Sequence, residues 1–188
     1  MSAAIAQTTM NRLLALMRGI DALNEGVGRA SMWLVLAATL ISSGNAVVRY
    51  GFNRSSNAWL EIQWYLFALI FLLSAGYTLK HNGHVRIDIL HGRFSPRLQA
   101  WVDLVGGLLF LLPLCGLMIW MGWSDFAASW AVNEASPDSG GLVRWPIKLA
   151  IPLGFGLLAL QGFAEIIRRA AFLGGFTPQA LEKPEEPV

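Results

Sequence analysis

Residues 59–79 read WLEIQWYLFALIFLLSAGYTL and contain one charged side chain, that of Glu61. A helix needs about 20 mostly apolar residues to cross the hydrocarbon core of a bilayer, because each residue advances it by about 1.5 Å. This stretch therefore predicts a transmembrane helix. The same criterion predicts three more, over residues 31–48, 98–123 and 147–167, and thus an all-α membrane protein with four transmembrane helices.

The composition of the whole chain indicates that lipid is its main solvent. Apolar residues make up 55% of the 188 residues, charged residues only 14%, and the mean hydropathy is +0.50. In a soluble domain about a quarter of the residues are charged. The net charge is +2, but the basic residues lie between the apolar stretches, where they orient helices rather than follow a phosphate backbone. We therefore expect contacts with membrane lipids and no nucleic-acid partner.

The distribution of Lys and Arg predicts the direction of the spans. Ten of the 14 basic residues lie before the first span, between the second and third, or after the fourth, and four lie on the other side. Cytoplasmic loops carry the excess of Lys and Arg, so both chain ends are predicted to be cytoplasmic (N-in, C-in). The basic residues expected to contact lipid headgroups are Arg29, Lys80, Arg93, Arg97, Arg168 and Arg169.

The spans divide the chain into three predicted parts. Residues 1–29 carry apolar side chains at helical spacing, which predicts a cytoplasmic amphipathic helix in the headgroup layer. A soluble-type helix that binds a partner is the alternative. Residues 30–169 form the predicted transmembrane domain, expected to pack as a four-helix bundle with short links, and residues 170–188 form a cytoplasmic tail.

The link of residues 80–97 between the second and third spans has a helical pattern of its own. Its apolar side chains recur at helical spacing before Pro96, which predicts a short interfacial helix. Near its start, His84, Arg86 and Asp88 are close enough in sequence to form one polar cluster. Ordinary contact of these side chains with lipid headgroups is the alternative.

The ionisable side chains within the spans lie near the span ends. Glu61 and Lys148 lie near the outer ends, and Asp103 and Glu165 near the inner ends. A charge at the bilayer centre is costly and usually serves transport or proton relay, so the uncharged centres favour a supporting subunit over a transporter. The expected ion pairs are Glu61 with Arg49, Lys148 or a partner subunit, and Glu165 with Arg168 and Arg169.

Several chemical functions are excluded by what the spans lack. Haem ligation within a membrane needs histidines inside helices, whereas His81, His84 and His91 all lie in one link. Disulfide chemistry needs a pair of cysteines, and Cys115 is the single cysteine of the sequence. The histidines lack the regular spacing of a metal site. We therefore expect no enzyme activity, no cofactor and no metal.

Tryptophans gather at the predicted outer ends of the second, third and fourth spans. Indole prefers the membrane interface, where its ring is dry and its N–H is wet, so anchoring explains most of them. Six on one face exceed what anchoring needs, and some are expected to contact a partner. The predicted partner interface consists of Glu61, Trp64, Trp123, Asp125, Trp130, Glu134, Trp145 and Lys148.

The order of several short motifs resembles one family of membrane proteins. Glu61 opens the second span, the run HVRID of residues 84–88 follows it, and EAS of residues 134–136 precedes Trp145, Lys148 and the Ile151-Pro152 pair. In this order and at these depths, over residues 30–169, the motifs resemble the small membrane subunit (the Q subunit) of tripartite ATP-independent periplasmic (TRAP) transporters.

The resemblance implies partners and a setting for the chain. It implies the bacterial inner membrane, a large sodium-coupled membrane subunit that carries the solute, and a periplasmic binding protein that delivers an organic acid. The small subunit is then expected to be a non-catalytic scaffold for the large subunit and to help the binding protein dock. The competing reading is a small transporter or channel that acts alone as an oligomer.

Overall fold

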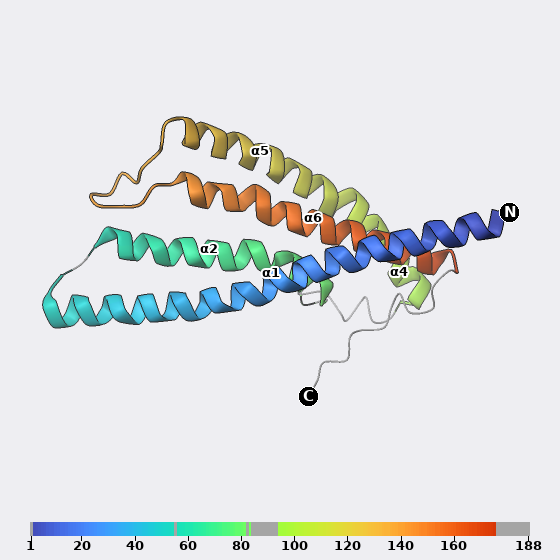
Figure 1. Cartoon of the computed structure of the whole chain (residues 1–188), viewed down its shortest axis with the longest axis horizontal. Helices are drawn as coiled ribbons and strands as arrows, with labels where there is room; N and C mark the ends of the chain where they lie inside the picture. Colours follow the sequence, from blue (N-terminus) through green and yellow to red (C-terminus); the bar gives the residue numbers. More distant parts are fainter. Residues whose placement is uncertain (1, 55, 82, 84–93, 176–188) are drawn as a thin grey trace.

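The computed structural model describes residues 2–54, 56–81, 83 and 94–175, and it is helical throughout except in the links. Within these residues no strand occurs, apart from one isolated antiparallel bridge between Ala135 and Val143. The helices, labelled in Figure 1, are α1 (Ser2–Phe52), α2 (Asn57–Lys80), α4 (Pro96–Gly106), the π-helical turn η1 (Gly107–Leu111), α5 (Leu112–Ala131) and α6 (Trp145–Leu173).

Four helical stretches are long and apolar enough to cross a membrane. They are Leu13–Phe52, Asn57–Lys80, Pro96–Ala131 and Trp145–Leu173, the third of which joins α4, η1 and α5 into one continuous rod. The predicted all-α architecture with four spanning helices is confirmed. The direction of the helices across the membrane stays a prediction.

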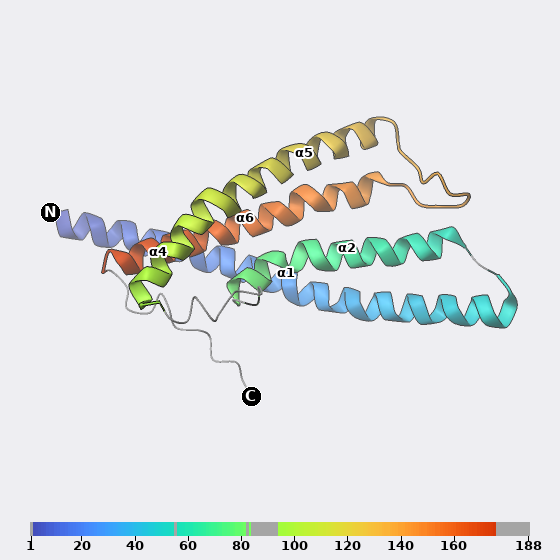
Figure 2. The same ribbon diagram turned by 180° about the vertical axis from the view of Figure 1, so that it is seen from behind.

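The four helices form a row rather than a closed bundle. α2 packs between α1 and α6, and α5 packs on the other side of α6, as both views of the ribbon show (Figures 1 and 2). The expected bundle is therefore replaced by the order α1–α2–α6–α5. Lipid solvates apolar side chains on both faces of such a row, so the helices need not enclose a core as they would in water.

Small residues bring neighbouring helices of the row together. A Cβ atom added to Gly154 of α6 would lie 2.7 Å from the backbone oxygen of Leu72 on α2. A Cβ atom added to Gly122 of α5 would lie 2.9 Å from the side chain of Ile151 on α6. Membrane helices associate through close backbone approach of this kind. α2 and α6 are consequently the two inner helices of the row.

The first span and the predicted amphipathic helix form one rod. α1 continues from Ser2 to Phe52 without a break at Arg29, and 51 helical residues correspond to a length of about 77 Å. No proline interrupts the segment, and the close contact of Gly28 with Tyr77 keeps α1 against α2. The helix thus exceeds the thickness of a bilayer core. The predicted short interfacial helix, and the tail beyond residue 175, lie outside the described residues.

Candidate functional site

The charged side chains of the row gather at its two ends. We define the hairpin end by the α1–α2 link and the α5–α6 loop (residues 132–144), and the network end by the opposite ends of these helices (Figure 1). Between the two ends, four stretches contain no Asp, Glu, Lys, Arg or His in the sequence. These stretches are residues 30–48, 62–79, 104–124 and 149–164.

At the hairpin end, Glu61 of α2 holds the α5–α6 loop. Its carboxylate accepts hydrogen bonds from the Ser136 hydroxyl and from the backbone N–H of Leu142, the latter at 2.6 Å. Only 7% of Glu61 is exposed, so these two donors replace solvent around the charge. The predicted pairing of Glu61 with Arg49 or Lys148 is wrong, because the loop folds back over α2 and supplies the donors itself.

Further contacts from α2 fix the same loop. The Asn57 side-chain amide donates to the backbone oxygen of Ser139 at 3.0 Å, and the Tyr65 hydroxyl donates to that of Val143 at 3.2 Å. The backbone N–H of Ser136 donates across the loop to the oxygen of Leu142 at 2.9 Å. The loop therefore has a defined shape that is anchored at several points along α2.

Lys148 joins α5, the loop and α6. Its ammonium group lies 3.0 Å from the carboxylate of Asp125 and 2.6 Å from that of Glu134. The hydrogen bond from Lys148 lowers the pKa of the Glu134 carboxyl below its ordinary value of 4.5. This bridge closes the loop at its base, close to the aromatic residues described next.

An aromatic cluster lies beside the loop. The rings of Trp130 and Trp145 have centroids 4.3 Å apart in an edge-to-face arrangement, and Phe126 lies between Trp123 and Trp145 at 5.5 Å and 6.4 Å. Trp64 is exposed on α2. Three of the four tryptophans predicted at a partner interface therefore belong to one cluster, and the fourth projects from a different helix.

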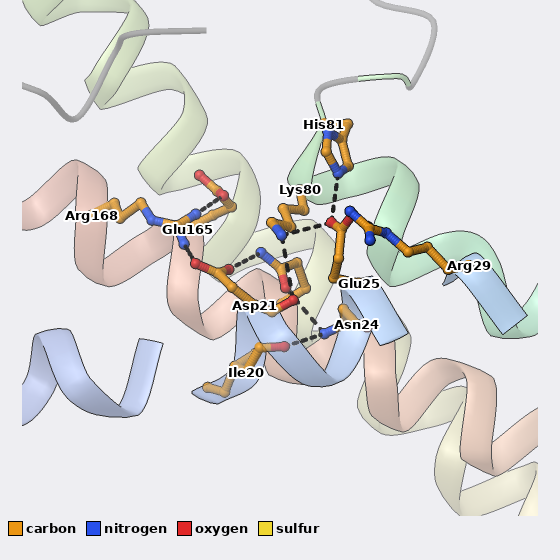
Figure 3. A network of polar contacts seen from close by, with 10 residues as sticks. Ile20, Asp21, Asn24, Glu25, Arg29, Lys80, His81, Glu165 and Arg168 are labelled. Atoms are coloured by element: carbon orange, nitrogen blue, oxygen red, sulfur yellow. Dashed lines mark hydrogen bonds and ion pairs between the residues drawn. The ribbon is translucent and has the colours of Figure 1, made fainter. Parts of the chain in front are cut away.

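At the network end, Glu25 of α1 gathers three cationic or ionisable donors (Figure 3). Its carboxylate lies 2.7 Å from the ammonium of Lys80, 2.9 Å from the imidazole of His81 and 3.0 Å from the guanidinium of Arg29. Lys80 and His81 stand at the end of α2. This carboxylate therefore fastens α1 to α2.

A second part of the network fastens α1 to α6 (Figure 3). Arg168 forms ion pairs with both Asp21 and Glu165. The Gln161 amide donates to Asp21 at 2.9 Å and accepts from the Asn24 amide at 3.0 Å. Gln161 and Asn24 are fully buried, and the Asn24 amide also lies within hydrogen-bond distance of the backbone oxygens of Ile20, at 3.3 Å, and Leu157, at 3.5 Å.

A third contact ties α6 to α4. Arg169, which is 7% exposed, lies with its guanidinium 3.3 Å from the Asp103 carboxylate. Of the six basic residues predicted at lipid headgroups, Lys80, Arg168 and Arg169 thus point to acidic groups of their own chain. Arg29 also pairs with Glu25 but remains exposed, and Arg97 is exposed near the start of α4. Arg93 lies outside the described residues, as do His84, Arg86 and Asp88 of the predicted link cluster.

The network contains residues that the sequence analysis did not select as a site. Asp21 and Glu25 are four residues apart on α1, and Gln161, Glu165 and Arg168 recur at helical spacing on α6. Two polar stripes on long, otherwise apolar helices are a signal of contact between those helices. The predicted pair of Glu165 with Arg168 is confirmed. In the described part of the chain, no group of three His, Cys, Asp or Glu residues could hold a metal ion.

This geometry defines a helical membrane protein with several spans, whose helices are joined by ion pairs and hydrogen bonds at both ends. The family model for the DctQ component of tripartite ATP-independent periplasmic transporters matches residues 28–172. The chain therefore belongs to this family, and it is a small permease component of a TRAP transporter. The predicted family resemblance is confirmed.

Two relatives give the same family. A Haemophilus influenzae protein, provisionally described as a TRAP transporter small permease protein, is 32% identical over 96 residues, which cover 51% of this chain and 58% of the relative. The C4-dicarboxylate TRAP transporter small permease protein DctQ of Pseudomonas aeruginosa is 27% identical over 143 residues, which cover 74% of this chain and 66% of the relative. The matches thus leave about a third or more of each relative uncovered.

Proposed function

We propose that this small permease is a non-catalytic scaffold that holds a large sodium-coupled membrane subunit, which carries the solute. In this arrangement the chain adds to the part of the assembly that stays fixed in the membrane while the carrier moves. The proposal extends to a periplasmic binding protein, which the chain helps to dock. No step of the transport reaction is assigned to side chains of this chain.

The observation that carries the proposal is the pairing of acidic groups. The described helices contain six acidic side chains, and each has a partner within the chain. These are Asp21, Glu25, Glu61, Asp103, Asp125 and Glu165. A carrier needs a polar group that binds its ion or solute at depth and releases it. Carboxylates that are engaged at the helix ends support a static role.

The row arrangement supplies surface for a large membrane partner. Large apolar side chains are exposed along the uncharged stretches, among them Phe71 of α2, Phe110 of η1 and Trp120 of α5. A row exposes two broad apolar faces, whereas a closed bundle hides one side of every helix. One face is proposed to lie against the large subunit and the other against lipid.

The hairpin end is proposed to face the periplasm and the binding protein. The basic residues outside the spans favour N-in, C-in topology, which turns the α5–α6 loop outward. On this surface Trp64, Trp123 and Trp130 are exposed, and the Lys148 bridge brings together the polar groups of Asp125 and Glu134, which lie close to Trp123 and Trp130 in the sequence. Exposed aromatic anchors within a polar rim suit a transient protein contact. Glu61 contributes by shaping the loop, since its carboxylate is engaged there.

The solute is proposed to be an organic acid. One relative is described as part of a C4-dicarboxylate transporter, which supports this class of solute for the assembly. Residues that select the solute would then lie on the large subunit and the binding protein.

Co-purification tests the scaffold proposal. The tagged chain is expressed with and without the large subunit of its own transporter and purified in mild detergent. We expect a stoichiometric complex that survives size-exclusion chromatography, because an apolar face of the row is covered by the partner. Complete separation of the two chains under conditions where each remains folded and monodisperse would contradict the proposal.

A further inference from the structure

A small cavity at the hairpin end has the composition of a binding site. It has a volume of about 380 Å³ and lies between the last turns of α1 and the start of α2. Its lining residues are Gly44, Asn45, Val48, Arg54, Ser56 and Trp59. The set combines one cation, one amide, one hydroxyl and one indole around an otherwise apolar space.

The strongest indication of a ligand is Asn45. It is 9% exposed and lines the cavity, and it has no hydrogen-bond partner among the residues that the structure describes. Its amide atoms are not among the fully enclosed polar atoms of the described residues, so they remain accessible from the cavity that the residue lines. A molecule in the cavity would supply the missing hydrogen bonds. Asn45 therefore indicates a polar ligand.

The charged and polar groups of the cavity indicate that this ligand carries a negative charge. Arg54 carries a guanidinium that has no ion pair among the described side chains. Ser56 is the residue that precedes the 24-residue helix α2, and its hydroxyl does not cap the helix. The first turn of α2 contains no acidic residue, so its N–H groups and the positive end of the helix dipole are available there. The first carboxylate of the helix, that of Glu61, lies in the second turn and is engaged by the α5–α6 loop. All three features favour an anion with hydrogen-bond-accepting oxygens.

The position of the cavity indicates which kind of molecule carries the anionic group. Arg54 lies in the α1–α2 link, beyond the uncharged stretches 30–48 and 62–79, while Val48 and Trp59 belong to the helix ends. This is the depth at which headgroups meet the hydrocarbon core, and indole prefers that depth. The cavity lies at this depth whichever side of the membrane the hairpin end faces.

We propose that this cavity binds the phosphate of a membrane phospholipid. Arg54, the Ser56 hydroxyl and the start of α2 bind the phosphate oxygens, and Asn45 hydrogen-bonds the glycerol ester region. Val48 and Trp59 contact the beginning of the acyl chains. The lipid would fill the space between two helix ends and stabilise the α1–α2 hairpin.

The test uses the full chain in detergent, with melting temperature measured against added ligand. Four probes are compared: dioleoyl phosphatidylglycerol, dioleoylglycerol with the same chains and no phosphate, inorganic phosphate, and succinate. We expect phosphatidylglycerol to raise the melting temperature in a saturable way, and the other three to leave it unchanged. An equal effect of dioleoylglycerol would overturn the proposal, because the phosphate would then be irrelevant.

A variant of Arg54 and a matched control test whether the lipid binds at this cavity. Arg54→Gln should weaken the apparent affinity for phosphatidylglycerol by about tenfold or more, because one charge-assisted contact is lost. Arg49→Gln removes the same charge from an exposed position that does not line the cavity, and should change the affinity by less than about twofold. Equal effects of the two variants would overturn the proposal.

Gly44→Leu tests the cavity itself. A Cβ atom at Gly44 meets nothing within 4 Å, so the new side chain can enter the open space while the helix gains propensity. We expect unchanged or higher melting temperature without lipid and no further rise with phosphatidylglycerol. A full lipid-dependent rise in this variant contradicts the site. Stabilisation by phosphate or succinate that depends on Arg54 would overturn the lipid assignment and favour a soluble anion.

Discussion

Gly154 offers a direct test of how α6 packs on α2. In Gly154→Ala the added methyl would lie 2.7 Å from the backbone oxygen of Leu72, whereas ordinary van der Waals contact begins at 3.4 Å. The helices must therefore separate by about 0.7 Å. A gap of this size costs the neighbouring atoms of α2 and α6 about a quarter to a half of their dispersion energy. A main-chain oxygen cannot rotate away. Overpacking of this kind costs about 1–3 kcal/mol.

Gly156→Ala is the matched control, because the same substitution lies two residues further along the same helix. A Cβ atom there meets nothing within 4 Å, so only the gain in helix propensity remains, which is about 1 kcal/mol. The propensity term cancels in the difference between the two variants, and Gly154→Ala should be less stable than Gly156→Ala by about 1–3 kcal/mol.

The assay is reversible unfolding of the purified chain in mixed micelles, followed by circular dichroism as the fraction of sodium dodecyl sulfate increases. Both variants must give the same unfolding slope as the parent chain for the free energies to be comparable. A difference below about 0.5 kcal/mol between the two variants, which is within the scatter of additivity, would refute the close approach of α6 to α2.

Three further predictions concern the polar contacts. Glu61→Gln should release the α5–α6 loop and increase its cleavage by added protease. The two donors bond to different carboxylate oxygens, and in glutamine one of these positions becomes an NH2 group that cannot accept. An unchanged cleavage rate would contradict the anchoring role. The Glu134–Lys148 bridge should protect the loop above about pH 4.5 and lose that protection as the pH falls through the lowered pKa of Glu134. Lys148→Met should weaken this pH dependence without abolishing it, because the Glu61 carboxylate also holds the loop; an unchanged pH dependence would contradict the role of the bridge. Gln161→Leu should cost about 1–3 kcal/mol in the same unfolding assay, because Asn24 loses one of its acceptors and the Asp21 carboxylate loses a donor; a neutral result would contradict this role of Gln161.

The spans could be predicted from the sequence because lipid imposes a simple requirement on length and polarity. Residues 59–79 lie within α2 (Asn57–Lys80), and residues 147–167 lie within α6 (Trp145–Leu173). The arrangement of the spans in a row could not be predicted in this way. It depends on which small residues meet, such as Gly154 with Leu72, and hydropathy does not contain that information.

The partners of the charged residues were harder to predict than their positions. Arg168 follows a span and looks like a headgroup ligand, yet it meets Asp21, which lies 147 residues earlier in the chain. Pairing between helices requires knowledge of which helices are neighbours. Glu61 shows a second limit, because one of its donors is the backbone N–H of Leu142, and side-chain chemistry does not reveal such a donor.

Sodium-driven uptake in liposomes tests the scaffold role most directly. The chain alone, the large subunit alone and the two together are reconstituted at equal density, with the binding protein and a radiolabelled C4-dicarboxylate outside and a sodium gradient imposed. We expect no uptake by this chain alone and gradient-dependent uptake when both membrane subunits are present. Saturable, sodium-dependent uptake by this chain alone would contradict it.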